Sequence, residues 1–127
     1  MADESMWGNL ESLPIIETPA IILKKQASIL TDITKNVLRG YVKIDSGEGG
    51  EMYIQLYILA PSLGEYRYAV LSVSHGVNMY PASVIDNIKG EKFNCDNKDT
   101  LLNVLKLILS SKEIRNIVAS LISQSKA

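Results

Sequence analysis

His75 is the chain's only histidine, and an imidazole side chain can gain or lose a proton near neutral pH. It ends a strand-like segment, and ends of strands often carry binding sites. Tyr80 and Asp86 follow it closely in the sequence. Because a histidine beside a phenol or a carboxylate can act as an acid or a base, one hypothesis is an enzyme or a small-ligand binder. Its pocket would lie near His75, Tyr80 and Asp86.

Other chemical signatures are missing from the sequence. One cysteine, Cys95, and one histidine cannot build a Cys/His zinc site within one chain. We find no H-E-x-x-H, G-x-S-x-G or G-x-x-x-x-G-K pattern. Acidic residues surround a glycine-rich turn at residues 45–51, but without the spacing of a calcium-binding loop. We therefore expect no cofactor, no metal and no catalytic residue, and in the simpler interpretation His75 bonds a turn carbonyl.

A second candidate site is a group of tyrosines. Tyr53, Gln55 and Tyr57 alternate with aliphatic residues, as in a strand with one buried face. Tyr66 and Tyr68 belong to the next predicted strand, and we expect them on the same face. Tyrosine buries a large area while keeping a polar tip, which is typical of protein interfaces. Cross-strand pairing that only covers the sheet is the alternative interpretation.

The elements that would position these side chains begin with a helix predicted over residues 19–38. Thr18 can cap it, and Pro19 takes the first helical position, where its missing N–H has no cost. Gly40 follows the expected end, where a left-handed residue is favoured. Apolar residues recur along one broad side, and charged residues lie on the other.

The pattern then changes to a period of two, which predicts strands separated by glycine- and proline-containing turns. Four short strands with tight turns indicate an antiparallel meander. Pro81 cannot donate a hydrogen bond within a sheet, so we expect its strand at an edge. The strands are predicted at residues 41–45, 51–60, 66–75 and 79–86.

The remaining residues predict a polar loop that contains Cys95 and then two helices. Asp99 is a plausible cap for the first helix, and Ser110 with Glu113 forms a capping-box pattern for the second. The fold class is therefore α+β: an N-terminal helix, a four-stranded antiparallel meander sheet and two C-terminal helices packed on one sheet face. The opposite, tyrosine-bearing face is left without a helix to cover it.

The length and the net charge of the chain limit the kinds of function that we expect. A chain of 127 residues fits one domain, predicted at residues 18–127. Residues 1–17 form an N-terminal extension that is partly mobile and too apolar for a free tail. We expect its first few residues to be mobile and the later ones to lie against the domain or a partner. A net charge of -1 gives no general attraction to nucleic acid, so nucleic-acid binding is disfavoured.

The sequence indicates a cytoplasmic protein. One cysteine cannot form an intrachain disulfide, the acidic start lacks a secretory apolar region, and no apolar run is long enough to span a membrane. The predicted function is a non-catalytic protein–protein interaction module that forms a homodimer through its tyrosine-rich open sheet face. An adaptor, an inhibitor or an immunity-type protein that binds another protein would use the same face.

Overall fold

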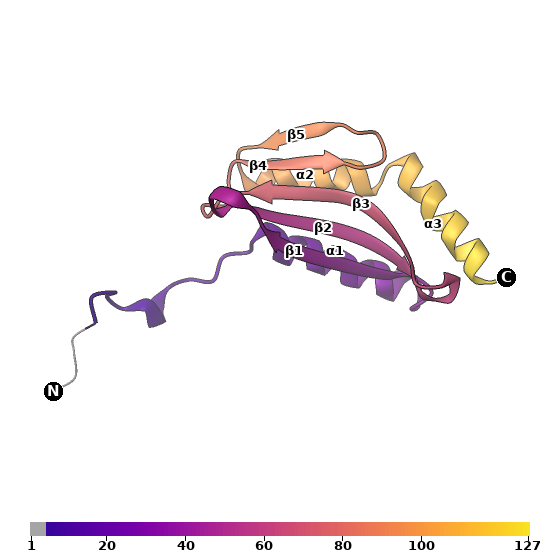
Figure 1. The fold of residues 1–127 in the computed structure, drawn as a ribbon, viewed down its shortest axis with the longest axis horizontal. Helices are drawn as coiled ribbons and strands as arrows, with labels where there is room; N and C mark the ends of the chain where they lie inside the picture. Colours follow the sequence, from indigo (N-terminus) through magenta and orange to yellow (C-terminus); the bar gives the residue numbers. More distant parts are fainter. Residues whose placement is uncertain (1–4) are drawn as a thin grey trace.

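A five-stranded antiparallel sheet, with its three long helices on one side, forms the domain in the computed structural model (Figure 1). The structure describes residues 5–127. The α+β class is confirmed, but the sheet has five strands where four were predicted. The main elements are α1 (Pro19–Ile33), β1 (Arg39–Ser46), β2 (Met52–Ala60), β3 (Tyr66–His75), β4 (Ala82–Asp86), β5 (Lys92–Cys95), α2 (Lys98–Leu109) and α3 (Lys112–Ser125).

Helix α1 begins where the sequence predicts but ends earlier. The Thr18 hydroxyl accepts a hydrogen bond from the Ile21 N–H, which satisfies one free donor of the first turn. The helix ends at Ile33, and not at residue 38, because the next residues reverse the chain. Lys35 and Asn36 adopt left-handed conformations, with φ of 52° and 67°.

Gly40 lies inside β1 and not at the end of a helix, so its predicted role was wrong. A Cβ at this position would lie 2.3 Å from the Cα and the carbonyl oxygen of Ala27 in α1. The missing side chain therefore allows α1 to pack closely on β1. The Gly40 N–H also donates to the Thr31 hydroxyl at 3.0 Å, which links the strand to the helix.

The strands follow one another across the sheet in sequence order, from β1 to β5, as a meander should. The additional strand, β5, lies in the segment predicted as a polar loop. Its outward residues are polar, whereas Phe93 and Cys95 pair with Val84 and Ala82 on the helix-covered side. Cys95 is fully buried. Pro81 immediately precedes β4, and β5 occupies the sheet edge beyond it.

A β-bulge changes the direction of the side chains in the first half of β3. Leu56 of β2 lies opposite Leu71, but the next residue, Tyr57, lies opposite Ala69, so Val70 is an extra residue. Val70 and Leu71 are both buried. Because side chains alternate along a strand, the extra residue transfers Tyr66 and Tyr68 to the other face of the sheet.

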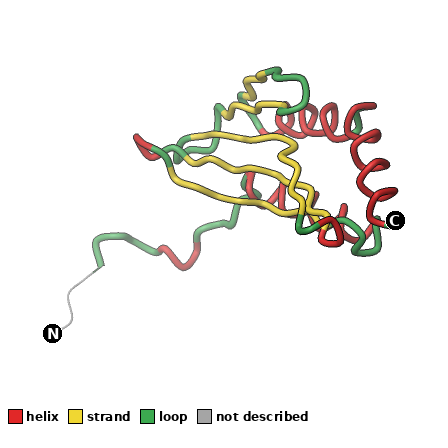
Figure 2. The backbone as a smooth tube through the Cα atoms, turned by 45° about the vertical axis from the view of Figure 1, so that its right-hand side comes forward, coloured by secondary structure: helices red, strands yellow, loops and turns green. Residues whose placement is uncertain are grey.

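In the view of Figure 1, α1 and α2 lie behind the sheet and α3 lies beside its right-hand end, and the turned view of Figure 2 also places α3 at the right of the strands. Asn97 caps α2 and Ser111 caps α3, each by accepting a backbone N–H. The predicted caps, Asp99 and Ser110, were each wrong by one or two positions. The buried core lies between the helices and the sheet, around Leu23, Leu71 and Leu101.

Residues 5–16 lead away from the domain instead of packing on it (Figure 1). Their apolar side chains are exposed, and Ile15 retains 95% of its accessible surface. The prediction of mobile first residues concerns residues 1–4, which lie outside the described part of the chain.

Candidate functional site

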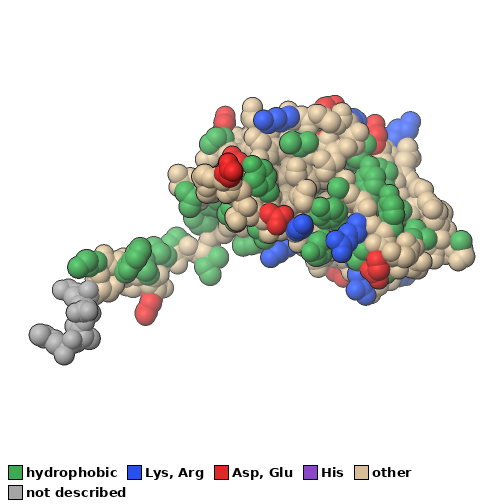
Figure 3. All heavy atoms as spheres, in the orientation of Figure 1, with side chains coloured by type: hydrophobic (Ala, Val, Ile, Leu, Met, Phe, Trp, Pro, Cys, Tyr) green, Lys and Arg blue, Asp and Glu red, His purple; other side chains and the backbone are tan. Residues whose placement is uncertain are grey.

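The open face is the side of the sheet that faces away from α1, α2 and α3. Figure 3 views the molecule from this side, where hydrophobic side chains lie among acidic and basic groups; Lys43 and Asp45 of this face form an ion pair at 3.7 Å. Cross-strand register identifies the side chains that share it, since paired residues point the same way. On the three longest strands they are Arg39, Tyr41, Lys43, Asp45, Tyr53, Gln55, Tyr57, Leu59, Arg67, Ala69, Ser72 and Ser74.

A pair of tyrosines lies across the first two strands of this face. Tyr41 is directly opposite Tyr57, and their ring centres are 6.0 Å apart with an angle of 44° between the planes. The guanidinium of Arg67 lies 5.8 Å from the centre of the Tyr41 ring, within the range of a cation–π contact. The Tyr57 hydroxyl donates to Gln55 Oε1 at 2.8 Å. These contacts fix large side chains that present both apolar and polar atoms to solvent.

Tyr53 extends the tyrosine surface toward the turn between β1 and β2. Its hydroxyl donates to Glu51 Oε2 at 2.7 Å, and this hydrogen bond is the main reason why the pKa of Tyr53 is raised. Its ring passes over Gly47, where a Cβ would come within 2.2 Å of the ring. The glycine therefore leaves room for the ring. The predicted set Tyr53, Gln55 and Tyr57 does share one face.

Tyr66 and Tyr68 do not belong to that face, which corrects their expected placement. The β-bulge at Val70 directs both toward the helices. There they line a hollow beside α3, together with Leu63, Ile117 and Leu121. Sequence reasoning also missed Tyr41 and Arg67, which complete the open-face cluster. Tyr41 lies in a predicted strand, but only the register of β1 on β2 shows that it meets Tyr57.

The three residues of the alternative pocket do not meet at one site. His75 is opposite Ala82, whereas Asp86 is opposite Leu71, so His75 and Asp86 lie at opposite ends of the β3–β4 pair. Four residues along a strand correspond to about 13 Å. The buried His75 Nδ1 is 2.6 Å from the Gly76 carbonyl oxygen, as the simpler interpretation predicts.

Asp86 and Tyr80 have separate structural environments. The Asp86 carboxylate accepts the backbone N–H of Ile88 at 2.8 Å and shapes the turn after β4. The Tyr80 hydroxyl is buried and has no hydrogen-bond partner. Burial is also the main cause of its raised pKa, which the positive charge of Lys98 opposes. A phenol in this environment favours its neutral form and is poorly placed to act as a base.

The environment of the Cys95 thiol disfavours its reactive, deprotonated form. The thiol is fully buried, and burial, followed by the charge of Asp96, raises its pKa. Reaction requires the thiolate, so both effects oppose it. Within residues 5–127, no three acidic, histidine or cysteine side chains are grouped so that they could hold a metal ion. No helix in the described part of the chain is long and apolar enough to cross a membrane.

The side chains of the open face therefore contact one another across the strands. They include a cross-strand tyrosine pair, a guanidinium over one of its rings and a hydrogen-bonded tyrosine–glutamine pair. Comparisons with protein-family models, with curated proteins and with solved structures find no match for this chain.

Proposed function

We propose that this protein is a non-catalytic interaction module, which binds a second copy of itself through the open face. One observation supports the proposal: the tyrosine-bearing side of the sheet faces away from α1 and α2, and α3 at the end of the sheet does not cover it. Tyr41 and Tyr53 keep 43% and 42% of their surface exposed. The chain's own helices cover the other side.

The composition of the open face supports protein binding. Tyrosine and arginine are the residues that most often contribute strongly to the stability of interfaces. Their rings here are held by contacts within one sheet, so little side-chain entropy is lost when a partner binds. The sheet gives a broad surface, which suits another protein better than a small ligand. Two such faces related by a two-fold axis would pair each tyrosine cluster with the other copy.

A different protein could use the same face, and the predicted adaptor, inhibitor and immunity-type functions remain compatible with this proposal. In each of them, the protein would act by occupying a surface of its partner, without chemistry. A reducing compartment such as the cytoplasm agrees with a single cysteine that cannot form an intrachain disulfide.

Sedimentation analysis of the purified protein over the micromolar range tests the proposal. Truncation of the central ring in Tyr57→Ala should weaken self-association by about 1–2 kcal/mol, or roughly tenfold. Tyr66→Ala is the control, because Tyr66 is a tyrosine of the same sheet that lies on the helix side, where it is 47% exposed, whereas Tyr57 is half-buried. Circular dichroism confirms that both variants are folded.

Equal association constants for the wild-type protein and the folded Tyr57→Ala variant would exclude the open face as the contact. A wild-type protein that remains a monomer throughout the micromolar range would exclude the second copy as its partner. If only the Tyr66→Ala variant lost association, the interface would lie on the helix side of the sheet and not on the open face.

A further inference from the structure

The N-terminal arm, residues 5–16, is an apolar segment that no other described part of the same chain covers. Trp7 is 79% exposed and Ile15 is 95% exposed. Exposed apolar residues are ordinary when scattered, but a continuous group of them marks an interaction site. The exposed large apolar residues of the arm are Met6, Trp7, Leu10, Leu13, Ile15 and Ile16.

Glu17 fixes the root of the arm to the domain. Its carboxylate bridges Lys25 of α1 and Lys98 of α2, with a distance of 2.9 Å between Glu17 Oε1 and Lys98 Nζ. These ion pairs hold the root near the N-terminal ends of both helices. From this point the arm leads away from the domain (Figure 1). The arm is therefore presented to solvent by a defined anchor.

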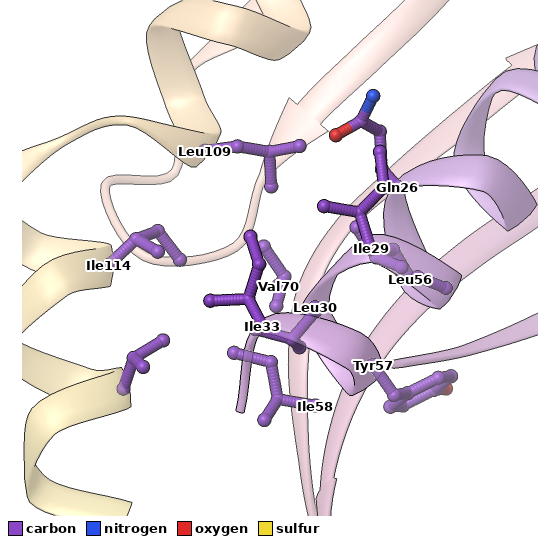
Figure 4. Close-up of a pocket in the computed structure, with 12 residues that line it drawn as sticks. Gln26, Ile29, Leu30, Ile33, Leu56, Tyr57, Ile58, Val70, Leu109 and Ile114 are labelled. Carbon is purple, nitrogen blue, oxygen red and sulfur yellow. The ribbon is translucent and has the colours of Figure 1, made fainter. Parts of the chain in front are cut away.

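The helix groove is an apolar hollow of about 200 Å³ on the other side of the sheet from the open face. Helix α1 forms one wall, and α3 with the end of α2 forms the other. Figure 4 shows the labelled side chains of α1, Leu109 and Ile114 directed toward the space between these walls. Six of its lining residues are Ile29, Ile33, Val70, Leu109, Ile114 and Val118.

The walls of the helix groove are not fully covered. Ile33 keeps 74% of its surface exposed and Ile29 keeps 45%. An adjoining hollow shares Gln26 and Leu109 with the groove and adds Lys106, so the apolar channel continues between α1 and α2. The groove thus has the shape and chemistry to take apolar side chains from an extended segment.

Charge also matches the arm to this channel. Residues 5–16 contain Glu11 and no lysine or arginine. Lys106 supplies a positive charge beside the apolar walls. The arm and the channel therefore each carry one charge, and the two charges have opposite signs, so that a single ion pair between Glu11 and Lys106 could add to the apolar contact.

The position of Glu17 indicates that the arm bound in a given groove comes from a second copy of the chain. Ile33 lies about 21 Å along α1 from Pro19, so the groove extends toward the end of the helix opposite the anchor. The arm of the same chain leads the other way. Residues 5–16 can extend over about 40 Å, which is enough to cross the groove of a neighbouring molecule.

We infer that the arm of each copy binds in the helix groove of a second copy. Reciprocal exchange around a two-fold axis buries both apolar surfaces and gives two identical contacts per dimer. This contact is distinct from the open-face contact of the proposed function, because the two surfaces lie on opposite sides of the sheet and share only Tyr57 among the residues named for them. A chain that uses both surfaces would form assemblies larger than a dimer.

Trp7 is the only tryptophan of the chain, so its fluorescence reports on the arm alone. We expect the emission of the full-length protein to move to shorter wavelength as concentration rises. The midpoint should coincide with that of self-association measured by sedimentation. In the Ile33→Glu variant the shift should disappear, and association through the arm should weaken about tenfold or more. Ile33 is largely exposed, so this substitution leaves the core intact.

Two further variants distinguish binding of the arm in the helix groove from nonspecific hydrophobic association and from the open-face contact. Val77→Ser removes an exposed apolar side chain from the β3–β4 turn, where 85% of it is exposed, and should leave the Trp7 shift unchanged. Tyr53→Ala should also leave it unchanged, because the Tyr53 ring is on the open face and does not line the groove. A mixture of Trp7→Ser and Ile33→Glu copies retains one of the two contacts and should associate more strongly than either variant alone.

Three results would overturn the inference. Trp7 emission typical of full exposure at all concentrations would show that the arm has no apolar site. Emission of a buried indole that does not depend on concentration would assign the arm to its own chain. Self-association that leaves the Trp7 emission unchanged would place the contact elsewhere.

Discussion

Substitution of Gly40 by alanine tests the packing that assigns the two faces of the sheet. The new Cβ would lie 2.3 Å from the Cα of Ala27 and 2.6 Å from its carbonyl carbon. Non-bonded carbon atoms approach to about 3.5–4.0 Å, so α1 must move outward by more than about 1 Å. The contact is with backbone atoms, and a change of side-chain rotamer cannot relieve it.

The expected cost lies at the upper end for overpacked cores, about 3 kcal/mol in the free energy of unfolding. That is a large part of the 5–15 kcal/mol that stabilises a typical domain. Urea unfolding followed by circular dichroism measures it. Gly76→Ala is the control, because its Cβ would have no neighbour within 4 Å and its φ is not left-handed. The free energy of unfolding of Gly76→Ala should remain within about 1 kcal/mol of that of the wild-type protein.

A Gly40→Ala variant with the stability of the Gly76→Ala control would refute the close packing of α1 on β1. It would also remove the reason for placing the tyrosine pair on the side away from the helices. If the packing is correct, the folded fraction of Gly40→Ala should still self-associate through the open face, because its tyrosines are unchanged.

The other predictions concern the helix caps, the cysteine and the anchor of the arm. Asn97→Ala should cost about 1 kcal/mol in thermal or urea unfolding, and Asp99→Ala less, because Asn97 is the residue that accepts the Thr100 N–H. Cys95 should resist alkylation at pH 8 until urea unfolds the chain, because the thiol is buried; rapid modification of the native protein would contradict this. Two lysines lower the pKa of Glu17 from 4.5 to about 2, chiefly through hydrogen bonds with Lys25 and then Lys98. The anchor should therefore contribute fully above pH 4.5 and be lost as the pH falls through 2, which a carboxyl titration by nuclear magnetic resonance can follow; a midpoint near 4.5 would show that the ion pairs do not form.

Much of the fold could be predicted because strong periodic patterns determine it. The alternation of Ile54, Leu56 and Ile58 with polar residues identified β2, and their burial confirms it. Thr18 with Pro19 identified the start of α1. Short polar turns between strands made a meander the simplest topology, and the structure has that topology.

The errors come from features that local patterns do not reveal. The alternating run from Tyr66 to His75 gives no signal of a bulge, so an extra residue at Val70 moved two tyrosines to the helix side. Strand β5 is too short and polar to show alternation, and its pairing with β4 determines it. Gly40 has the position of a helix cap in the sequence, whereas its actual role depends on Ala27 in a separate element.

The candidate site was predictable only in part for the same reason. Tyr53, Gln55 and Tyr57 lie on one strand, so their shared face follows from alternation alone. Tyr41 joins them because the register of β1 on β2 places it opposite Tyr57. Arg67 joins them because the bulge in β3 turns its side chain to the open face. Structure was therefore needed to recognise the tyrosine pair and the guanidinium that contacts it.

Iodination of the tyrosines, read by mass spectrometry at low and high protein concentration, tests the role of the open face most directly. Tyr41, Tyr53 and Tyr66 have similar exposures, of 43%, 42% and 47%, in the single copy. Our account predicts that association slows the modification of Tyr41 and Tyr53 and leaves that of Tyr66 unchanged. Slower modification of Tyr66 with no change at Tyr41 and Tyr53 would contradict it.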